Sequence, residues 1–264
     1  MEINRKVALV TNATDYAGPP AITALTEAGF QVLAHDDAFA DWDTWLKFSA
    51  PYPNVERVHA ATPESVIEAA WNVSGRLNVI VSNDHFPAIH RSLPHASLDD
   101  LRKTLEKLVV APFALLKAAV PFFQAQGGGN VVMITSCRTK LPMHGGAIPD
   151  AARAAANALV RSFAIELASL NVAVNAIAPN FLYSEAYYPR AIFVDDSAGA
   201  AYVKSEVPVG RLGRPDEIGD LILFLACTES RFLTGSVIDF SGGWPAAKPR
   251  PWRSQRDSAA PAEP

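Results

Sequence analysis

Ser136 and Arg153 are the residues of this chain whose types and positions best support chemistry. Ser136 directly follows the apolar run VVMIT, and Arg153 lies beyond a turn-rich loop, LPMHGGAIP. Open α/β sheets bind ligands at the carboxyl ends of their strands, which places Ser136 where it can hold a substrate hydroxyl. Arg153 is expected in the first turn of a helix over 150–169, where a cation opposes the helix dipole. That cost favours a functional role for the guanidinium.

Proton transfer at this place requires a base, and four side chains are candidates. His144 lies on the same loop and has an intrinsic pKa near 6.5, so it is the tentative catalytic base, although loop histidines are more often simply exposed. Asp150 is the next candidate along the chain. Tyr187 and Tyr188 could reach the site from a later loop.

The segment after the strand expected at 172–177 is a candidate anion site. Pro179, Asn180, Phe181 and Leu182 either form a simple tight turn or offer backbone N–H groups and apolar walls to a weakly hydrated anion. Both interpretations stand at this point.

The stretch TNATDYAG, residues 11–18, lies between an apolar run and a helix-like segment, the context of a glycine-rich dinucleotide-binding turn. Asn12 and Tyr16 occupy the first two glycine positions, and only Gly18 remains. The Tyr16 side chain takes up the volume that a cofactor would need, so no cofactor is expected. The histidines lack metal-ligand spacing, so no metal is expected either.

Short β-branched runs alternate with helical patterns, which predicts a parallel sheet built from βαβ units. The fold class is therefore a Rossmann-type, doubly wound α/β fold with a seven-stranded, mostly parallel sheet and helices on both faces. Helices are expected over 21–28, 101–123 and 150–169, with starts at Thr62-Pro63, at Ser97 and near Pro215. The expected strands are 7–11, 31–34, 55–59, 79–82, 131–135, 172–177 and 237–240.

The 264 residues are interpreted as one domain over 1–250 and a flexible tail over 251–264, in which Trp252 is expected to dock on this chain or a neighbouring subunit. A net charge of −4 without a basic run argues against nucleic acid. Two cysteines and no signal peptide favour the cytoplasm. No apolar stretch of about 20 residues is apparent, so no membrane span is expected.

The motifs above resemble those of the short-chain dehydrogenase/reductase superfamily and, within it, the halohydrin dehalogenases. TNATDYAG resembles their aromatic-plugged first loop, and VSND, 81–84, replaces a dehydrogenase NNAG. Val109 takes the place of the superfamily's helix asparagine. APNFLYSE, 178–185, resembles the halide-binding loop, with Tyr188-Pro189 in register. VPVGRLGRPDEIG and FSGGW are general superfamily elements.

The resemblance implies a cofactor-independent lyase that converts vicinal haloalcohols to epoxides and halide, or opens epoxides with small anions. Ser136, Arg153 and the tentative base His144 would be catalytic. The resemblance also implies a homotetramer formed by helix pairs, one with an alanine-rich face. The halide and substrate would be bound by Tyr16, Pro179, Asn180, Phe181, Leu182 and Tyr188, with Trp252 from this or a neighbouring subunit.

One departure bears on catalysis. The dehalogenase triad is Ser–Tyr–Arg, and Pro149 stands at the tyrosine position, where it can neither accept a proton nor donate a hydrogen bond. Proline suits the first position of a helix, so the fold is expected to tolerate it. Three interpretations remain: another group replaces the tyrosine, the chain is a catalytically degenerate binding subunit, or it is an NAD(P)-dependent oxidoreductase. The last lacks the expected tyrosine, lysine and cofactor pocket.

Overall fold

The computed structural model describes residues 5–247 and contains a seven-stranded, entirely parallel sheet. The strand order is β3-β2-β1-β4-β5-β6-β7, so the winding direction reverses between β1 and β4. The predicted Rossmann-type fold class is confirmed. The strands are β1 Val7–Val10, β2 Gln31–His35, β3 Val55–Val58, β4 Val79–Ser82, β5 Gly129–Ile134, β6 Val172–Pro179 and β7 Val237–Phe240.

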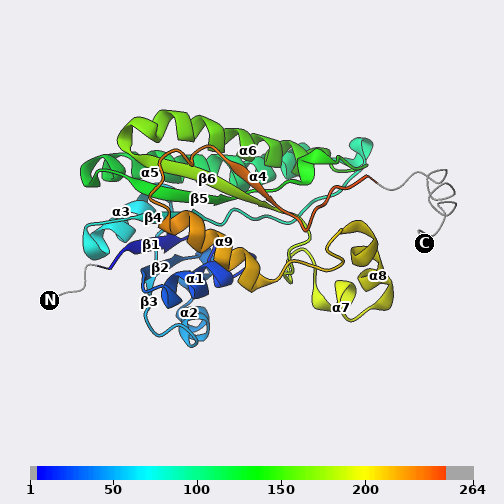
Figure 1. The fold of residues 1–264 in the computed structure, drawn as a ribbon, viewed down its shortest axis with the longest axis horizontal. Helices are drawn as coiled ribbons and strands as arrows, with labels where there is room; N and C mark the ends of the chain where they lie inside the picture. Colours follow the sequence, from blue (N-terminus) through cyan, green and yellow to red (C-terminus); the bar gives the residue numbers. More distant parts are fainter. Residues whose placement is uncertain (1–4, 248–264) are drawn as a thin grey trace, which may run out of the picture.

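Helices cover both faces of this sheet (Figure 1). On one face α1, Gly18–Glu27, packs against α9, Pro215–Cys227, beside α2, Trp42–Ser49. The other face carries three helices, α3 Pro63–Ser74, α5 Ala111–Gln126 and α6 Ala147–Leu167.

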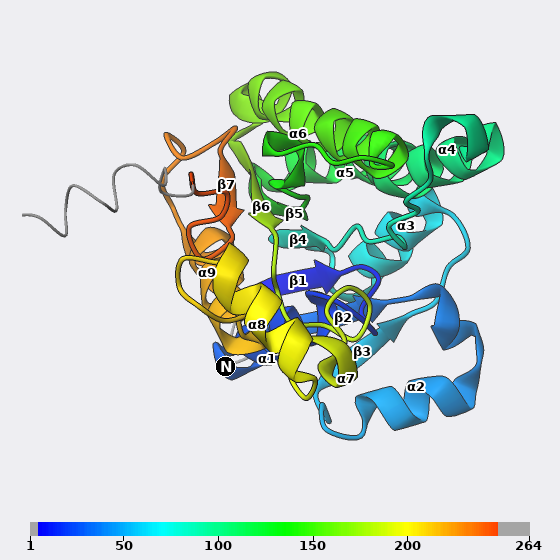
Figure 2. The ribbon, with the colours of Figure 1, turned by 90° about the vertical axis from the view of Figure 1, so that its right-hand side faces the viewer.

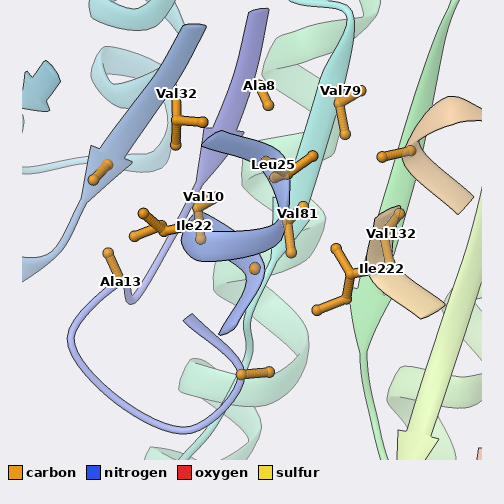
Figure 3. Packing of buried hydrophobic residues seen from close by; sticks show 14 of the residues in the cluster. Ala8, Val10, Ala13, Ile22, Leu25, Val32, Val79, Val81, Val132 and Ile222 are labelled. Carbon is orange, nitrogen blue, oxygen red and sulfur yellow. The ribbon is translucent and has the colours of Figure 1, made fainter. Parts of the chain in front are cut away.

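The central strands are buried on both faces, which explains their nearly continuous apolar sequences. In Figure 3 side chains of α1, among them Ile22 and Leu25, lie over valines of β1 and β4. Ile222 of α9 extends the same layer. A second apolar layer, on the opposite face, joins the sheet to α3, α5 and α6.

Several helix starts follow the predicted signals. The Thr62 hydroxyl accepts a hydrogen bond from the N–H of Ser65, and the Ser65 hydroxyl accepts one from the N–H of Thr62, so α3 begins with a capping box followed by Pro63. The Ser97 hydroxyl caps the next helix by accepting from the N–H groups of Asp99 and Asp100. α9 begins at the predicted Pro215.

The helix expected over 101–123 is longer than predicted. α4, Leu98–Leu105, continues through a π-helical turn, Glu106–Val110, directly into α5. By length and composition alone, Leu98–Gln126 could cross a membrane, which corrects the statement that no segment is long and apolar enough. Its apolar composition also has a local cause, because Leu116, Ala119 and Phe123 pack into the core beneath it.

The helix expected over 150–169 begins three residues earlier, at Ala147, with Gly146 as its N-cap. Pro149 is therefore the third residue of α6 rather than the first. It is tolerated because N–H groups in the first turn have no partner within the helix. Arg153 is the seventh residue and lies in the second turn, so the dipole argument from a first-turn cation does not apply to it.

The loop after β1 retains the backbone path of a glycine-rich turn. Asn12 and Tyr16 have left-handed φ angles of 47° and 55°, a conformation that glycine adopts without cost. Gly18 serves close packing, since a Cβ there would lie 2.5 Å from the carbonyl oxygen of Ala13. The side chains of the turn have changed while its conformation has remained.

Two further helices follow β6. They are α7, Arg190–Phe193, and α8, Ser197–Glu206, and they contact each other. Figure 2 shows them, in yellow, in front of the sheet. Val203 of α8 packs with Phe181 and Trp244 in a small apolar cluster near the end of β6.

Candidate functional site

A cavity of about 270 Å³ lies beyond the carboxyl ends of the central strands. Its walls come from the loops after β1, β4, β5 and β6 and from the first two turns of α6. This is where an open α/β sheet binds ligands. Ten candidate site residues named from the sequence line it: Tyr16, Ser136, Asp150, Arg153, Pro179, Asn180, Phe181, Leu182, Tyr187 and Tyr188.

Ser136 is held in place by both neighbouring segments. Its hydroxyl donates to the carbonyl oxygen of Pro179 at 3.2 Å and accepts from the N–H of Arg138 at 3.2 Å. The Asn157 amide of α6 donates to the Ser136 carbonyl oxygen at 2.9 Å. The hydroxyl therefore has a fixed orientation between the end of β6 and the start of the loop after β5.

Arg153 is only 7% exposed and its guanidinium is engaged on two sides. Nη1 donates to the carbonyl oxygen of Asp84 at 2.8 Å, and Nη2 donates to the hydroxyl of Tyr187 at 3.3 Å. A buried cation needs such partners. The guanidinium joins the loop after β4 to the loop after β6.

The Tyr187 hydroxyl has two further partners. It donates to the carbonyl oxygen of Phe86 at 2.7 Å and accepts from the N–H of Phe86 at 3.0 Å. Tyr187 lines the cavity, as does Pro149. A phenol oxygen thus meets Arg153 although the residue four positions before Arg153 is proline.

The tentative base is elsewhere. His144 is exposed and is not among the residues that line the cavity, so the structure does not bring it to Ser136 and Arg153. The loop turns through Gly145 and Gly146 between His144 and α6, which leaves His144 outside the pocket. Trp252 lies outside the described residues.

Asp150 does line the cavity, next to Pro149. Its Oδ1 atom is buried without a hydrogen-bond partner among residues 5–247. Partial desolvation raises the pKa of this carboxyl, while the charges of Arg138 and His90 act in the opposite direction.

The Pro179–Leu182 loop turns sharply at the end of β6. Phe181 has a left-handed φ of 57°, and the N–H of Asn180 donates to the carbonyl oxygen of Phe240 at 3.0 Å. The Tyr188 hydroxyl donates to Oδ1 of Asn180 at 2.8 Å, and its ring lies 5.1 Å from that of Phe181. Burial raises the pKa of Tyr188 to about 12, so the phenol remains neutral beside the cavity.

Tyr16 forms a partition at the topological switch point. Its ring contacts Tyr187 edge-on at 4.9 Å and lies 6.2 Å from His85. Burial raises its pKa well above the ordinary value. A second cavity of about 240 Å³, lined by residues such as Asn12, shares no lining residue with the first.

A dinucleotide cofactor spans the switch point of such a sheet. Its path would pass between the two cavities, where the Tyr16 ring lies between those of Tyr187 and His85, 4.9 Å and 6.2 Å away. The side chains present therefore do not fit an extended dinucleotide. Within the described part of the chain, no three His, Cys, Asp or Glu side chains gather as metal ligands.

Two charged residues in this region had no predicted role. Asp84 is buried, receives a hydrogen bond from the Ser82 hydroxyl at 3.0 Å, and has a pKa raised to about 7, chiefly by desolvation. Arg138 lines the cavity and has a buried Nη2 atom without an acceptor. Asp84 lies two residues after Ser82, and Arg138 lies two residues after Ser136. This position just beyond a strand was the sequence signal that could have identified both residues.

Comparison with known proteins shows which family the chain belongs to. A family model described as Enoyl-(Acyl carrier protein) reductase matches residues 54–245, most of the chain. The chain belongs to the short-chain dehydrogenase/reductase superfamily. An uncharacterized oxidoreductase of Thermotoga maritima, for example, is 28% identical over 248 residues, covering 92% of this chain and 98% of that protein.

Two solved structures within this superfamily fold resemble the chain more in sequence. A halohydrin dehalogenase bound to ethyl (2S)-oxiran-2-ylacetate is 32% identical, covers 93% of this chain and 100% of that chain, and has a TM-score of 0.90. A second structure, described as a dehalogenation enzyme, is also 32% identical, covers 92% and 100%, and has a TM-score of 0.87.

Proposed function

We propose that this superfamily member is a halohydrin dehalogenase-like lyase, which converts vicinal haloalcohols to epoxides and halide and opens epoxides in reverse. The observation that carries the proposal is the aromatic partition at Tyr16, which closes the cofactor path and leaves a small cavity lined by the Pro179–Leu182 loop. The 32% identity to a halohydrin dehalogenase over nearly the whole chain supports it.

Tyr187 is the base in this proposal, in place of the earlier candidate His144. As a phenolate its oxygen would be stabilised by the Arg153 guanidinium and by the N–H of Phe86, both already within hydrogen-bonding distance. Tyr187 is also one of the residues that line the cavity. A tyrosine from the loop after β6 would thus replace the one missing at Pro149.

The reaction then needs only this chain's own groups. The Ser136 hydroxyl binds the substrate hydroxyl, and Tyr187 accepts its proton. The resulting alkoxide attacks the neighbouring carbon, so a C–O bond forms while the carbon–halogen bond breaks. Both electrons of that bond leave with the halide, which the Pro179–Leu182 loop receives between Tyr16 and Tyr188. The proton on Tyr187 passes to solvent.

Halide release from small vicinal haloalcohols tests this function directly. Ethyl 4-chloro-3-hydroxybutanoate is a suitable first substrate, because its ring closure gives the same type of epoxide ester that the similar dehalogenase was bound to. Release above background, with the epoxide as product, is expected. Absence of release from several haloalcohols would reject the proposal.

One observation favours a second candidate, a ligand-binding subunit without turnover. The Tyr187 hydroxyl already donates to Phe86, and Pro149 can take no part in proton transfer. Such a protein would bind bromide and alcohols without releasing halide. An oxidoreductase, as several relatives are described, would instead bind NADH or NADPH, which fluorescence titration detects.

The assembly and location belong to the same proposal. The outer side of α6 exposes small residues, including Ala151, Ala154 and Ala158, which allow another helix to approach closely. The nearby Phe113 of α5 is 45% exposed. We propose a cytoplasmic homotetramer that uses these helices, to be tested by light scattering and fractionation.

A further inference from the structure

Arg138 is the arginine of the cavity wall that the proposed reaction leaves unused. It starts the short turn 138–140 that follows β5, and its half-buried side chain lines the cavity. Its backbone N–H is bound to Ser136, but its Nη2 atom is buried without an acceptor. A cationic side chain that lines a cavity favours a negatively charged ligand group there, because a cation removed from water needs such a partner.

The charged residues around Arg138 indicate which charge its ligand carries. Its positive charge acts on the carboxyl of Asp150 and on the phenol of Tyr188, from α6 and the loop after β6. Across residues 5–247, Arg138 forms no ion pair within 4.0 Å. The exposed His90 also lines this part of the cavity.

The balance of charge on the cavity wall is positive. Arg138 and Arg153 face one lining carboxyl, Asp150, whose neutral form is favoured by desolvation. Arg153 is already committed to Asp84 and Tyr187. Arg138 lines the same cavity without an ion pair among residues 5–247, and the planar fork of a guanidinium matches a carboxylate.

We propose that Arg138 binds a carboxylate on the substrate, so that the preferred substrates are short haloalcohol acids and the corresponding epoxy acids. This inference rests on the proposed dehalogenase function and names its substrate class. Because Ser136 and Arg138 both line one cavity of about 270 Å³, a small substrate that carries a hydroxyl and a carboxylate on a short carbon chain suits the pair. A 4-halo-3-hydroxybutanoate has this arrangement.

The kinetic test compares 4-chloro-3-hydroxybutanoate with its ethyl ester, using halide release by the purified full-length protein. We expect a higher kcat/KM for the acid. Arg138→Gln should lower the acid-to-ester ratio of kcat/KM roughly ten- to a hundredfold, the range for a charge-assisted hydrogen bond. Arg138→Lys, which keeps the charge but loses the fork, should give an intermediate ratio and guards against misfolding of the first variant.

A matched control is available in the same turn. Lys140 is exposed, pairs with Asp239 and does not line the cavity. Lys140→Gln removes the same charge two residues away and should leave the ratio unchanged. An unchanged ratio in Arg138→Gln, or an equal fall in Lys140→Gln, would overturn the inference.

Binding of 3-hydroxybutanoate separates this inference from the proposed reaction, because the compound contains no halogen. Calorimetry should show tighter binding of the acid than of its ethyl ester, and Arg138→Gln should abolish that preference. If this holds while no haloalcohol is turned over, the reaction fails and the carboxylate site stands. If halide is released without an acid preference, the carboxylate site fails and the reaction stands.

Bromide titration tests whether Arg138 binds the halide ion instead of the substrate carboxylate. If Arg138→Gln weakens bromide binding while the acid-to-ester ratio stays the same, then Arg138 serves the leaving ion and the inference is wrong. If bromide binding is unaffected while the ratio falls, the guanidinium recognises the substrate carboxylate.

Discussion

The Arg153 guanidinium donates a hydrogen bond to the hydroxyl of Tyr187 at 3.3 Å, although 34 positions separate the two residues. The expected Ser–Tyr–Arg pattern has proline at its middle position, yet a phenol meets the arginine from another loop. The same hydroxyl is bound to both backbone groups of Phe86. The contact links the ends of β4 and β6 across the candidate active site.

Replacing Tyr187 by phenylalanine removes this hydroxyl while keeping the ring. Because a positioned general base contributes roughly 10²–10⁴-fold, halide release from a vicinal haloalcohol should fall by that factor. Tyr183→Phe is the control, since Tyr183 lies on the same loop, bonds Glu185 and does not line the cavity. Equal rates in wild type and Tyr187→Phe would show that another group accepts the proton.

Pro149→Tyr should rescue the Tyr187→Phe variant. Position 149 lines the cavity one helical turn before Arg153, so a new phenol there has access to the guanidinium that Tyr187 has left. We expect the double variant to release halide at least tenfold faster than Tyr187→Phe alone, as an order-of-magnitude share of general-base catalysis. No recovery in a double variant that folds normally, judged by circular dichroism, would contradict the expectation that a phenol at position 149 reaches the Arg153 guanidinium.

Tyr16→Gly should open the partition between the two cavities. Loss of the buried ring and the cavity left behind should cost about 3–5 kcal/mol, only partly offset by relief of a left-handed φ, so the melting temperature should fall. Bromide affinity should also fall because a wall of the proposed anion site is lost. Asn12→Gly relieves a similar φ without opening this wall and should leave bromide affinity unchanged; a matching loss in both variants would place the effect elsewhere.

Asp84 should make the protein less stable as the pH rises from about 4 to 7. Its pKa is raised from 3.8 to about 7 by burial, so in this range the folded state holds a proton that the unfolded state has lost. The free energy of unfolding therefore decreases with pH, by up to about 4 kcal/mol for a shift of this size, and is constant for this group above pH 7.

Asp84→Asn removes this titration while keeping the size of the side chain. The difference in melting temperature between variant and wild type should increase from pH 4 to pH 7, in favour of the variant. Asp150→Asn, at a less buried carboxyl, serves as the comparison. Parallel pH profiles for wild type and Asp84→Asn would refute the protonated carboxyl.

The fold was predictable from the sequence because the short apolar runs of the strands and the helical patterns between them are both clear. Each expected strand is present with ends within two residues, since runs buried on both faces are apolar and bounded by turns. The start of α6 was missed because no capping side chain marks Gly146. The helix that runs from α4 through the π-helical turn into α5 was predicted as one element over 101–123, and only its two ends were placed too short.

The site was predictable where it depends on strand ends and not where it depends on side-chain direction. Ser136 and the Pro179–Leu182 loop follow β5 and β6, and the parallel sheet brings them together. His144 was wrongly placed in the pocket, because nearness along a loop says nothing about exposure. The partner of Arg153 could not be selected among several tyrosines without the fold.

The left-handed backbone at Asn12 and Tyr16 also bears on how this chain could regain a coenzyme. Glycine at both positions would follow the existing main-chain course without rearranging β1 or α1, and Gly18 already permits the tight approach of the helix. The barrier to restoring a phosphate-binding turn is thus confined to two side chains. Tyr16 is therefore the side chain to replace first when a phosphate-binding turn is designed on this backbone.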